Sequence, residues 1–231
     1  MTEPNISVLM TSYNNENTIE EAINSVLNQT YKNITLFILD DYSIDNTYKI
    51  IKNIKNNNNN LKIFRNKKNI GLTKSLNILI NKVSTDFIAR QDADDISLPN
   101  RLEEQIDYLL NNNLDACTTR SINKKTNKKI PGISFYIPIK LLLLYKNPFI
   151  HGSLLIKKEV LNNIGNYNES FYFAQDFKLM KDLIDEKYKV GILNKVLYKL
   201  NMENNISTIN AEEQKYFADC AKKGVLPIGR D

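Results

Sequence analysis

Short apolar runs and amphipathic stretches alternate along the first half of the chain. Residues 6–10 are apolar except for one serine, which is typical of a buried strand, and residues 18–28 carry apolar side chains at helical spacing. The same order recurs, with strands predicted at residues 34–39, 61–64 and 87–90 and helices at residues 45–54 and 72–83. This repeated order predicts an α/β fold in which a mostly parallel central sheet is flanked by helices.

The second half of the chain is less regular. A helix is predicted at residues 101–110 and a strand at residues 114–118. Residues 121–138 are basic and turn-forming, so we expect a boundary or a mobile loop there. The pattern then predicts helices at residues 139–145, 158–164, 176–186 and 211–223, a strand at residues 153–156, and a strand pair at residues 190–193 and 196–200. We therefore divide one domain into an α/β half, residues 1–120, and a smaller irregular half, residues 121–231.

The composition is that of an ordinary globular protein, with 42% hydrophobic and 25% charged residues. The formal net charge of +5 favours phosphate-bearing ligands or an anionic membrane surface as partners. The basic pairs at residues 67–68, 124–125 and 128–129 lack the interleaved aromatic residues that stack bases, so no nucleic-acid partner is expected.

Three features predict a cytoplasmic protein. Cys117 and Cys220 lie far apart and in no CxxC arrangement, which fits a reducing compartment. The first residues show no basic stretch followed by an apolar run and a cleavage site. The longest apolar run, within residues 137–145, is far shorter than the ~20 residues that cross a bilayer. Any membrane contact is therefore expected to be peripheral, at the inner face.

Polar and acidic residues follow the predicted strands of the first half. Because ligands of an open parallel sheet bind beyond the carboxyl ends of its strands, these residues mark a candidate site. Asp92, Asp94 and Asp95 would repel one another, and a divalent cation held by oxygen ligands would relieve that repulsion. The alternative is a solvated acidic turn that caps the next helix.

Four segments resemble family 2 glycosyltransferases of the GT-A fold in order and in spacing. They are residues 7–14 (SVLMTSYN), 39–47 (LDDYSIDNT), 69–77 (NIGLTKSLN) and 88–95 (IARQDADD). The match extends through about residue 105. The resemblance implies that residues 1–120 bind a nucleotide-sugar and that residues 121–231 bind the acceptor and supply the catalytic base.

The resemblance also implies roles for single residues at the donor site. Thr11 and Asp41 would hold the nucleobase, with Asp41 accepting a hydrogen bond from the uracil edge and Tyr13 packing beside the ring. Lys74 matches a basic position near the donor, although a lysine on an exposed helix face explains it equally well.

The segment from Asp92 through Ala93 to Asp94 resembles the DxD motif of the family. By that resemblance, Asp94 would bind the Mn²⁺ or Mg²⁺ that bridges the diphosphate. Asp92 would contact the ribose or the water shell of the metal.

Two segments of the second half resemble the family as well. Residues 147–153 (NPFIHGS) resemble the stretch ahead of an acceptor-side strand, so the single histidine, His151, becomes a candidate for lining the pocket. Residues 165–170, followed by residues 174–177, resemble a Gly-Tyr-Asp-Glu stretch and a Glu-Asp motif. Asp176 retains the position of the general base, and its structural alternative is to cap the following helix.

Gln175 and Asn201 depart from the family pattern, since they stand where an acid and a histidine are usual. We expect an inverting transfer of a sugar from a UDP-sugar to a hydroxyl of a glycan or glycolipid, in surface polysaccharide or lipooligosaccharide synthesis. A catalytically degenerate nucleotide-sugar-binding module is the alternative, which the two departures favour and the retained acids disfavour. A sugar nucleotidyltransferase is disfavoured because residues 11–18 contain no glycine.

Overall fold

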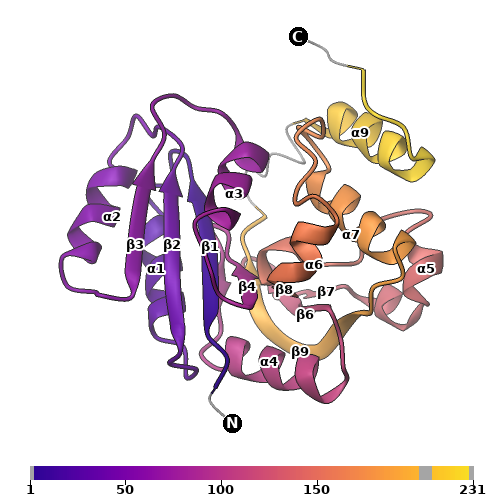
Figure 1. The fold of residues 1–231 in the computed structure, drawn as a ribbon, viewed down its shortest axis with the longest axis horizontal. Helices are drawn as coiled ribbons and strands as arrows, with labels where there is room; N and C mark the ends of the chain where they lie inside the picture. Colours follow the sequence, from indigo (N-terminus) through magenta and orange to yellow (C-terminus); the bar gives the residue numbers. More distant parts are fainter. Residues whose placement is uncertain (1–2, 203–209, 229–231) are drawn as a thin grey trace.

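The first four long strands form the parallel part of one nine-stranded sheet. The computed structural model describes residues 3–202 and 210–228 of the chain. The strands β1 (Ile6–Ser12), β2 (Ile34–Asp40), β3 (Leu61–Arg65) and β4 (Phe87–Arg90) pair in parallel in the order β3-β2-β1-β4 (Figure 1). The predicted α/β order is therefore confirmed in this half.

The remaining strands make the other half of the sheet mixed. β8 (Leu155–Lys157) lies antiparallel between β4 and β6 (Ala116–Asn123), and β9 (Val190–Leu200) runs parallel to β6. The short strand β5 (Ile96–Ser97), which the pattern did not predict, pairs antiparallel with β9. The prediction of two strands at residues 190–200 is wrong, because β9 is one continuous strand. Its register against β6 shifts near Thr119 and Arg120.

The prediction of a boundary or mobile loop at residues 121–138 is also wrong, because much of this segment forms regular structure. β6 continues through Asn123, and its end pairs antiparallel with β7 (Lys129–Ile130). A 3₁₀ turn, η1 (Ile133–Tyr136), follows. Backbone pairing of this hairpin outweighs the turn-forming composition. The expected boundary at residue 120 falls inside β6, so the two halves of the chain share one sheet.

Eight α-helices lie within the described residues, and most match their predicted positions. They are α1 (Ile19–Leu27), α2 (Thr47–Lys55), α3 (Leu72–Ile80), α4 (Arg101–Asn111), α5 (Ile139–Leu142), α6 (Lys158–Asn163), α7 (Gln175–Asp185) and α9 (Ala211–Lys223). Apolar residues at helical spacing form the buried stripe of α1. α5 is only four residues long, shorter than the helix predicted at residues 139–145.

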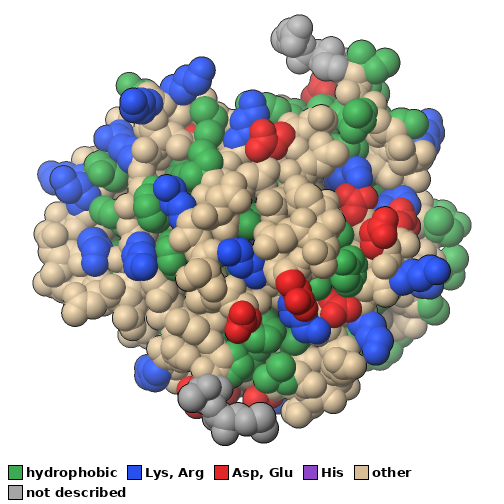
Figure 2. Space-filling model, in the orientation of Figure 1, with side chains coloured by type: hydrophobic (Ala, Val, Ile, Leu, Met, Phe, Trp, Pro, Cys, Tyr) green, Lys and Arg blue, Asp and Glu red, His purple; other side chains and the backbone are tan. Residues whose placement is uncertain are grey.

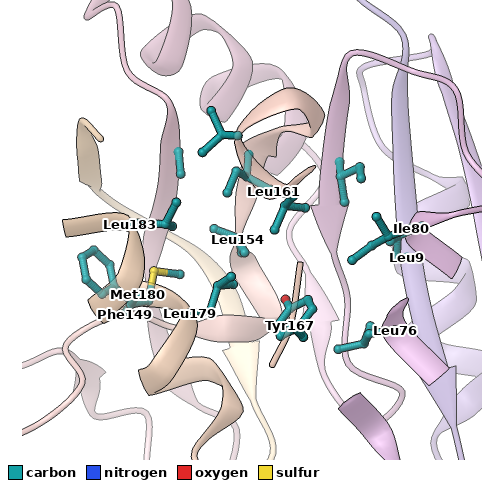
Figure 3. Close-up of a cluster of buried hydrophobic side chains, with 14 of the residues drawn as sticks. Leu9, Leu76, Ile80, Phe149, Leu154, Leu161, Tyr167, Leu179, Met180 and Leu183 are labelled. Carbon is teal, nitrogen blue, oxygen red and sulfur yellow. The ribbon is translucent and has the colours of Figure 1, made fainter. Parts of the chain in front are cut away.

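Two apolar layers cover the two faces of the sheet. One packs α1, α2 and α4 against side chains such as Val8 and Met10, and the other packs α3, α6, α7 and α9 against side chains such as Leu9. Figure 3 shows the second layer, in which Leu76 and Ile80 of α3 and Leu179 and Leu183 of α7 lie along it. Burial on both faces explains why β1 reads as an almost continuous apolar run.

The strand order reverses beside β1. The chain proceeds outward from β1 through β2 to β3 and then returns to place β4 on the other side of β1. In open α/β sheets, ligands bind in the crevice beyond the carboxyl ends of the strands at such a switch point. The ends of β1, β2 and β4 therefore locate the site.

Candidate active site

The ends of β1 and β2 are joined by hydrogen bonds that hold the predicted nucleobase residues next to each other. The Asp41 backbone N–H donates to the Ser12 carbonyl at 2.8 Å, and Ser12 pairs with Asp40. Thr11 lies in β1 and is half-buried, whereas the side chain of Tyr13 is 46% exposed just beyond the strand. The structure thus brings Thr11, Tyr13 and Asp41 to one edge of the sheet.

Asp41 is also a structural anchor. Its Oδ1 accepts hydrogen bonds from Asn66 Nδ2 at 2.7 Å and from the Ile70 N–H at 3.0 Å, and its Oδ2 accepts from the Gly71 N–H at 2.8 Å. A carboxylate offers about four lone-pair positions, so one remains for a ligand. Asp41 therefore fixes the loop that leads into α3, where Lys74 is exposed in the first turn.

The acidic motif follows β4 and rests on buried groups. Asp92 Oδ1 accepts a hydrogen bond from Arg90 Nη2 at 2.5 Å, and the Asp92 backbone N–H donates to Tyr198 Oη at 3.1 Å. Ala93 is buried in the apolar layer, so only its backbone is available to a ligand. Gly152 lies against the motif, since a Cβ there would stand 2.6 Å from Asp92 Oδ2 and 2.4 Å from Tyr198 Oη. Only glycine fits this position.

The carboxyls of Asp94 and Asp95 titrate abnormally. Burial and the neighbouring charge of Asp92 raise the pKa of Asp94 to about 6. Burial, followed by the charges of Asp92 and Asp94, raises the pKa of Asp95 well above its usual value, and Asp95 Oδ1 accepts a hydrogen bond from the Asn201 N–H at 2.7 Å. Asn201 therefore holds the motif through its backbone N–H. Because that hydrogen bond does not involve the side chain, it does not depend on whether residue 201 is asparagine or histidine.

The acidic motif fits a divalent cation that is only partly coordinated by protein. Within residues 3–202 and 210–228 no ion pair involves Asp94, and no group of three or more His, Cys, Asp or Glu side chains forms a metal cluster. A hard cation such as Mn²⁺ or Mg²⁺ prefers carboxylate oxygens and takes its remaining ligands from water or substrate phosphates. Asp94, with Asp92 beside it, could supply the protein ligands.

Two buried arginines lie behind the acidic motif. Arg101 Nη1 donates to the carbonyl oxygens of Arg90 at 2.9 Å and of Gly152 at 3.0 Å, and its guanidinium lies 5.5 Å from the ring centroid of Tyr198. Burial lowers the pKa of Arg101 to about 10, so it remains charged at neutral pH. The sequence analysis assigned no role to Arg90, Arg101 or Tyr198. The one signal in the sequence was the position of Arg90, two residues before the acidic run.

His151 links the motif to the second half of the site. It lies in the turn η2 (His151–Ser153), and its Nε2 is 2.7 Å from Tyr167 Oη. Burial, aided by the charge of Arg90, lowers the pKa of His151 to about 4, so the imidazole is neutral at pH 7. The charges of Asp92 and Asp176 both act on this imidazole, so both carboxylates lie in its vicinity.

Asp176 lies in the first turn of α7, but it does not cap the helix. The N-cap is Ala174, in a left-handed conformation with φ 53°, and it makes no side-chain capping bond, so the capping alternative is wrong. Asp176 Oδ2 instead accepts a hydrogen bond from Asn147 Nδ2 at 2.8 Å. Left-handed backbone at a non-glycine residue costs about 1 to 2 kcal/mol, and such strain gathers at functional sites.

Hydrogen bonds from α3 hold residues 167–171, which were expected on the acceptor side, against the first half of the chain. Asn77 Nδ2 donates to the Tyr167 carbonyl at 2.9 Å, and Thr73 Oγ1 donates to the Phe171 carbonyl at 3.2 Å. A hollow of about 770 Å³ lies along this seam between α3 and α7, and its lining includes neither Asp92 nor Asp176.

The model of the family described as "Glycosyl transferase family 2" matches residues 7–183. The chain belongs to this family. It is 30% identical over 207 residues to the putative glycosyltransferase EpsE of Bacillus subtilis, covering 87% of this chain and 74% of that protein. It is 33% identical over 191 residues to the O-antigen biosynthesis glycosyltransferase WbnJ of Escherichia coli, covering 78% of this chain and 72% of that protein. The chain is therefore an enzyme, a glycosyltransferase.

Two solved structures share the fold. S. aureus TarS in complex with UDP-GlcNAc superposes with a TM-score of 0.76 at 18% identity, covering 89% of this chain and 61% of that chain. The mannosyltransferase PcManGT from Pyrobaculum calidifontis, in complex with GDP-Man and Mn²⁺, superposes with a TM-score of 0.75 at 16% identity, covering 98% of this chain and 66% of that chain. The chain thus spans about three fifths to two thirds of these solved chains, and the expected GT-A fold is confirmed.

Proposed function

We propose that this glycosyltransferase is an inverting enzyme that transfers a sugar from a UDP-sugar to a hydroxyl of a glycan or glycolipid. The observation that carries the proposal is the placement of Asp92 and Asp176, whose charges act on the same buried imidazole of His151. The acid proposed for the donor site and the candidate base therefore both act on one buried side chain. We also propose that residues 1–120 bind the donor and that residues 121–231 bind the acceptor.

A direct displacement fits this arrangement. The acceptor oxygen forms a bond to the anomeric carbon while the bond from that carbon to the diphosphate oxygen breaks. The electron pair leaves with the diphosphate, and the acceptor proton passes to the Asp176 carboxylate. Asn147 orients Asp176 through its amide, and no protein nucleophile is needed. The DxD residues Asp92 and Asp94 would hold Mn²⁺ or Mg²⁺, which supplies charge stabilisation for the leaving diphosphate.

The donor class rests on the β1 and β2 ends. Asp41 keeps one lone-pair position that can accept from a uracil N–H, and the exposed ring of Tyr13 can pack on the base. The structures of the same fold hold UDP-GlcNAc in TarS and GDP-Man in PcManGT, so the fold accommodates both bases. Synthesis of surface polysaccharide or lipooligosaccharide, in the cytoplasm and at the inner face of the membrane, is the setting that we propose.

The test measures nucleotide release from a panel of UDP-sugars and GDP-mannose with Mn²⁺ and without acceptor. We expect slow release of UDP from one UDP-sugar and none in the presence of a chelator. Calorimetry should show UDP bound more tightly than GDP, and Asp41→Ala should weaken that binding. Tighter binding of GDP would overturn the donor class. Failure to release nucleotide from any donor would favour a binding module over an active transferase.

A further inference from the structure

One segment of the second half exposes large apolar side chains in succession. Ile133 is 89% exposed, Tyr136 75% and Leu144 63%, and Ile137, Leu141 and Tyr145 are also exposed. No helix within residues 3–202 and 210–228 is long and apolar enough to span a bilayer. Single exposed apolar residues are ordinary, but a gathering of this kind marks an interaction surface.

The segment is held in place by its inward-facing side chains. Leu142 and Leu143 of the α5 region are buried, and Leu143 belongs to the core layer of α7. The guanidinium of Arg120 lies 4.9 Å from the ring centroid of Phe135, and Arg120 Nη2 donates to the Pro131 carbonyl at 3.2 Å. Because these contacts fix the backbone, the exposed residues are presented outward by a packed structure.

The charged side chains of this segment all have one sign. Residues 124–146 contain six lysines and no aspartate or glutamate. Lys128, Lys129, Lys140 and Lys146 are exposed. Figure 2 shows apolar and basic side chains next to one another at the edge of the molecule where α5 lies in Figure 1. We name this surface the basic apolar face: Ile133, Tyr136, Ile137, Leu141, Leu144 and Tyr145, with these four lysines.

Charge complementarity selects the occupant of the face. Two copies of the chain that paired through it by a twofold axis would bring the same lysines together without an acidic partner, which disfavours a dimer. An anionic lipid surface offers negative charge for the lysines and an interfacial region for the apolar side chains, and tyrosine is enriched at such interfaces. The face therefore fits a membrane.

The face also continues into the pocket of the candidate base. Tyr145 and Lys146 line a pocket of about 280 Å³ together with Asn147 and Asp176. An acceptor whose lipid end stays in the bilayer would therefore present its sugar end close to Asp176. This step rests on the proposed function, because it takes Asp176 as the acceptor-side base.

We propose that the basic apolar face docks the enzyme on the anionic surface of a membrane and presents a lipid-linked acceptor to the pocket of Asp176. Each lysine close to an anionic surface contributes about fivefold to membrane partitioning, equivalent to about 1 kcal/mol. Three lysines therefore account for a partition ratio of about 100-fold. An apolar side chain at the interface adds roughly tenfold.

Flotation with vesicles tests the docking. The probes are vesicles of phosphatidylcholine alone and vesicles of equal parts phosphatidylcholine and phosphatidylglycerol. We expect binding only to the anionic vesicles, weakening between about 0.05 M and about 0.5 M salt as screening increases. K128Q/K129Q/K140Q should lower partitioning about 100-fold, and Ile133→Ser about tenfold.

Matched controls lie outside the basic apolar face. Lys49, Lys52 and Lys62 are exposed on α2 and β3, and α2 lies opposite α5 in Figure 1. K49Q/K52Q/K62Q removes the same charge and should change partitioning by less than about threefold, as should Leu110→Ser on α4. Equal losses in the control and test variants would overturn the docking face. Self-association of the wild type that Ile133→Ser abolishes would assign the face to a second copy instead.

Nucleotide release separates this proposal from the proposed function. Release of UDP from a UDP-sugar without vesicles should be unchanged in all these variants, because none of the substituted residues lies at the donor site. Vesicle binding in the expected pattern without any nucleotide release would refute the transferase proposal and leave the docking face standing. Nucleotide release without binding to anionic vesicles would refute the docking face alone.

Discussion

Replacing Asp94 by asparagine should stabilise the metal-free protein at neutral pH while removing its metal-dependent activity. The physical reason is the pKa of Asp94, which burial and the charge of Asp92 raise from the usual 3.8 to about 6. Above that pH the folded protein holds a half-buried carboxylate beside the charge of Asp92, and the charge of Lys124 offsets only part of the cost. Asparagine has the same shape and no charge, so the variant avoids this cost.

The size and the pH dependence of the effect follow from the raised pKa. Between 3.8 and about 6 the folded protein keeps a proton on Asp94 that the unfolded chain has lost, so stability falls as the pH rises through this window. A pKa of about 6 in place of 3.8 corresponds to about 3 kcal/mol at pH 7, which solvent screening reduces to about 1 to 3 kcal/mol. Near pH 4 the gain should shrink to about 0.5 kcal/mol.

Thermal unfolding with a chelator, at about pH 4 and about pH 7, measures the effect. A gain of 1 to 3 kcal/mol in a domain of this size raises the Tm by roughly 3 to 10 °C. Adding Mn²⁺ and UDP should raise the Tm of the wild type and leave that of Asp94→Asn almost unchanged, because ligands stabilise the state that they bind. A variant less stable than the wild type at pH 7, or full activity of Asp94→Asn in chelator, would refute the reasoning.

Three further substitutions test the rest of the site. Asp176→Asn should lower the transfer rate about 10²- to 10⁴-fold with unchanged UDP affinity, because the new side-chain amide still accepts the hydrogen bond from Asn147 but takes no proton. Steady-state kinetics measures the rate and calorimetry measures the affinity. A rate within a few-fold of wild type would show that the base is another residue, with Glu169 and Asp95 the next to test. Gly152→Ala should cost about 1 to 3 kcal/mol in urea unfolding and weaken donor binding, because the added Cβ would meet Asp92 and Tyr198; unchanged donor affinity would count against the contact. Ala174→Gly should raise stability by about 1 kcal/mol by relieving the left-handed strain, and it should lower the turnover number because Asp176 is less firmly placed; a loss of stability would show that the conformation is not strained.

Most of the first half of the fold could be predicted because its signals are local. The buried strands β1, β2 and β4 read as apolar runs, and the helices between them repeat their apolar residues at helical spacing. The errors came where pairing partners decide the conformation. β9 reads as two strands because Asn194 and Lys195 interrupt its apolar pattern, yet the register shift against β6 keeps it continuous.

The candidate site divides in the same way. Asp92, Asp94 and Asp176 could be proposed from the sequence because their positions match a spaced pattern in the chain, and in the structure the charges of Asp92 and Asp176 both act on the imidazole of His151. The residues that hold the acidic motif in place could not be predicted from the sequence. Tyr198 accepts a hydrogen bond from the Asp92 N–H although the two residues are 106 positions apart. A local hydrophobic pattern cannot predict a contact between residues so far apart in the sequence.

The sequence by itself therefore determined the order of strands and helices in the first half of the chain, and it predicted the sheet edge and the acidic residues that we propose for the site. These features depend on residue type and short-range spacing, which the chain carries directly. Only the tertiary structure decided how each acid behaves. Burial beside Asp92 sets the pKa of Asp94, the fold places Arg101 behind the motif, and the packing of Leu142 and Leu143 turns the basic apolar face outward. Each of these features depends on which segments, distant in the sequence, pack against each other, and that is decided only when the chain folds.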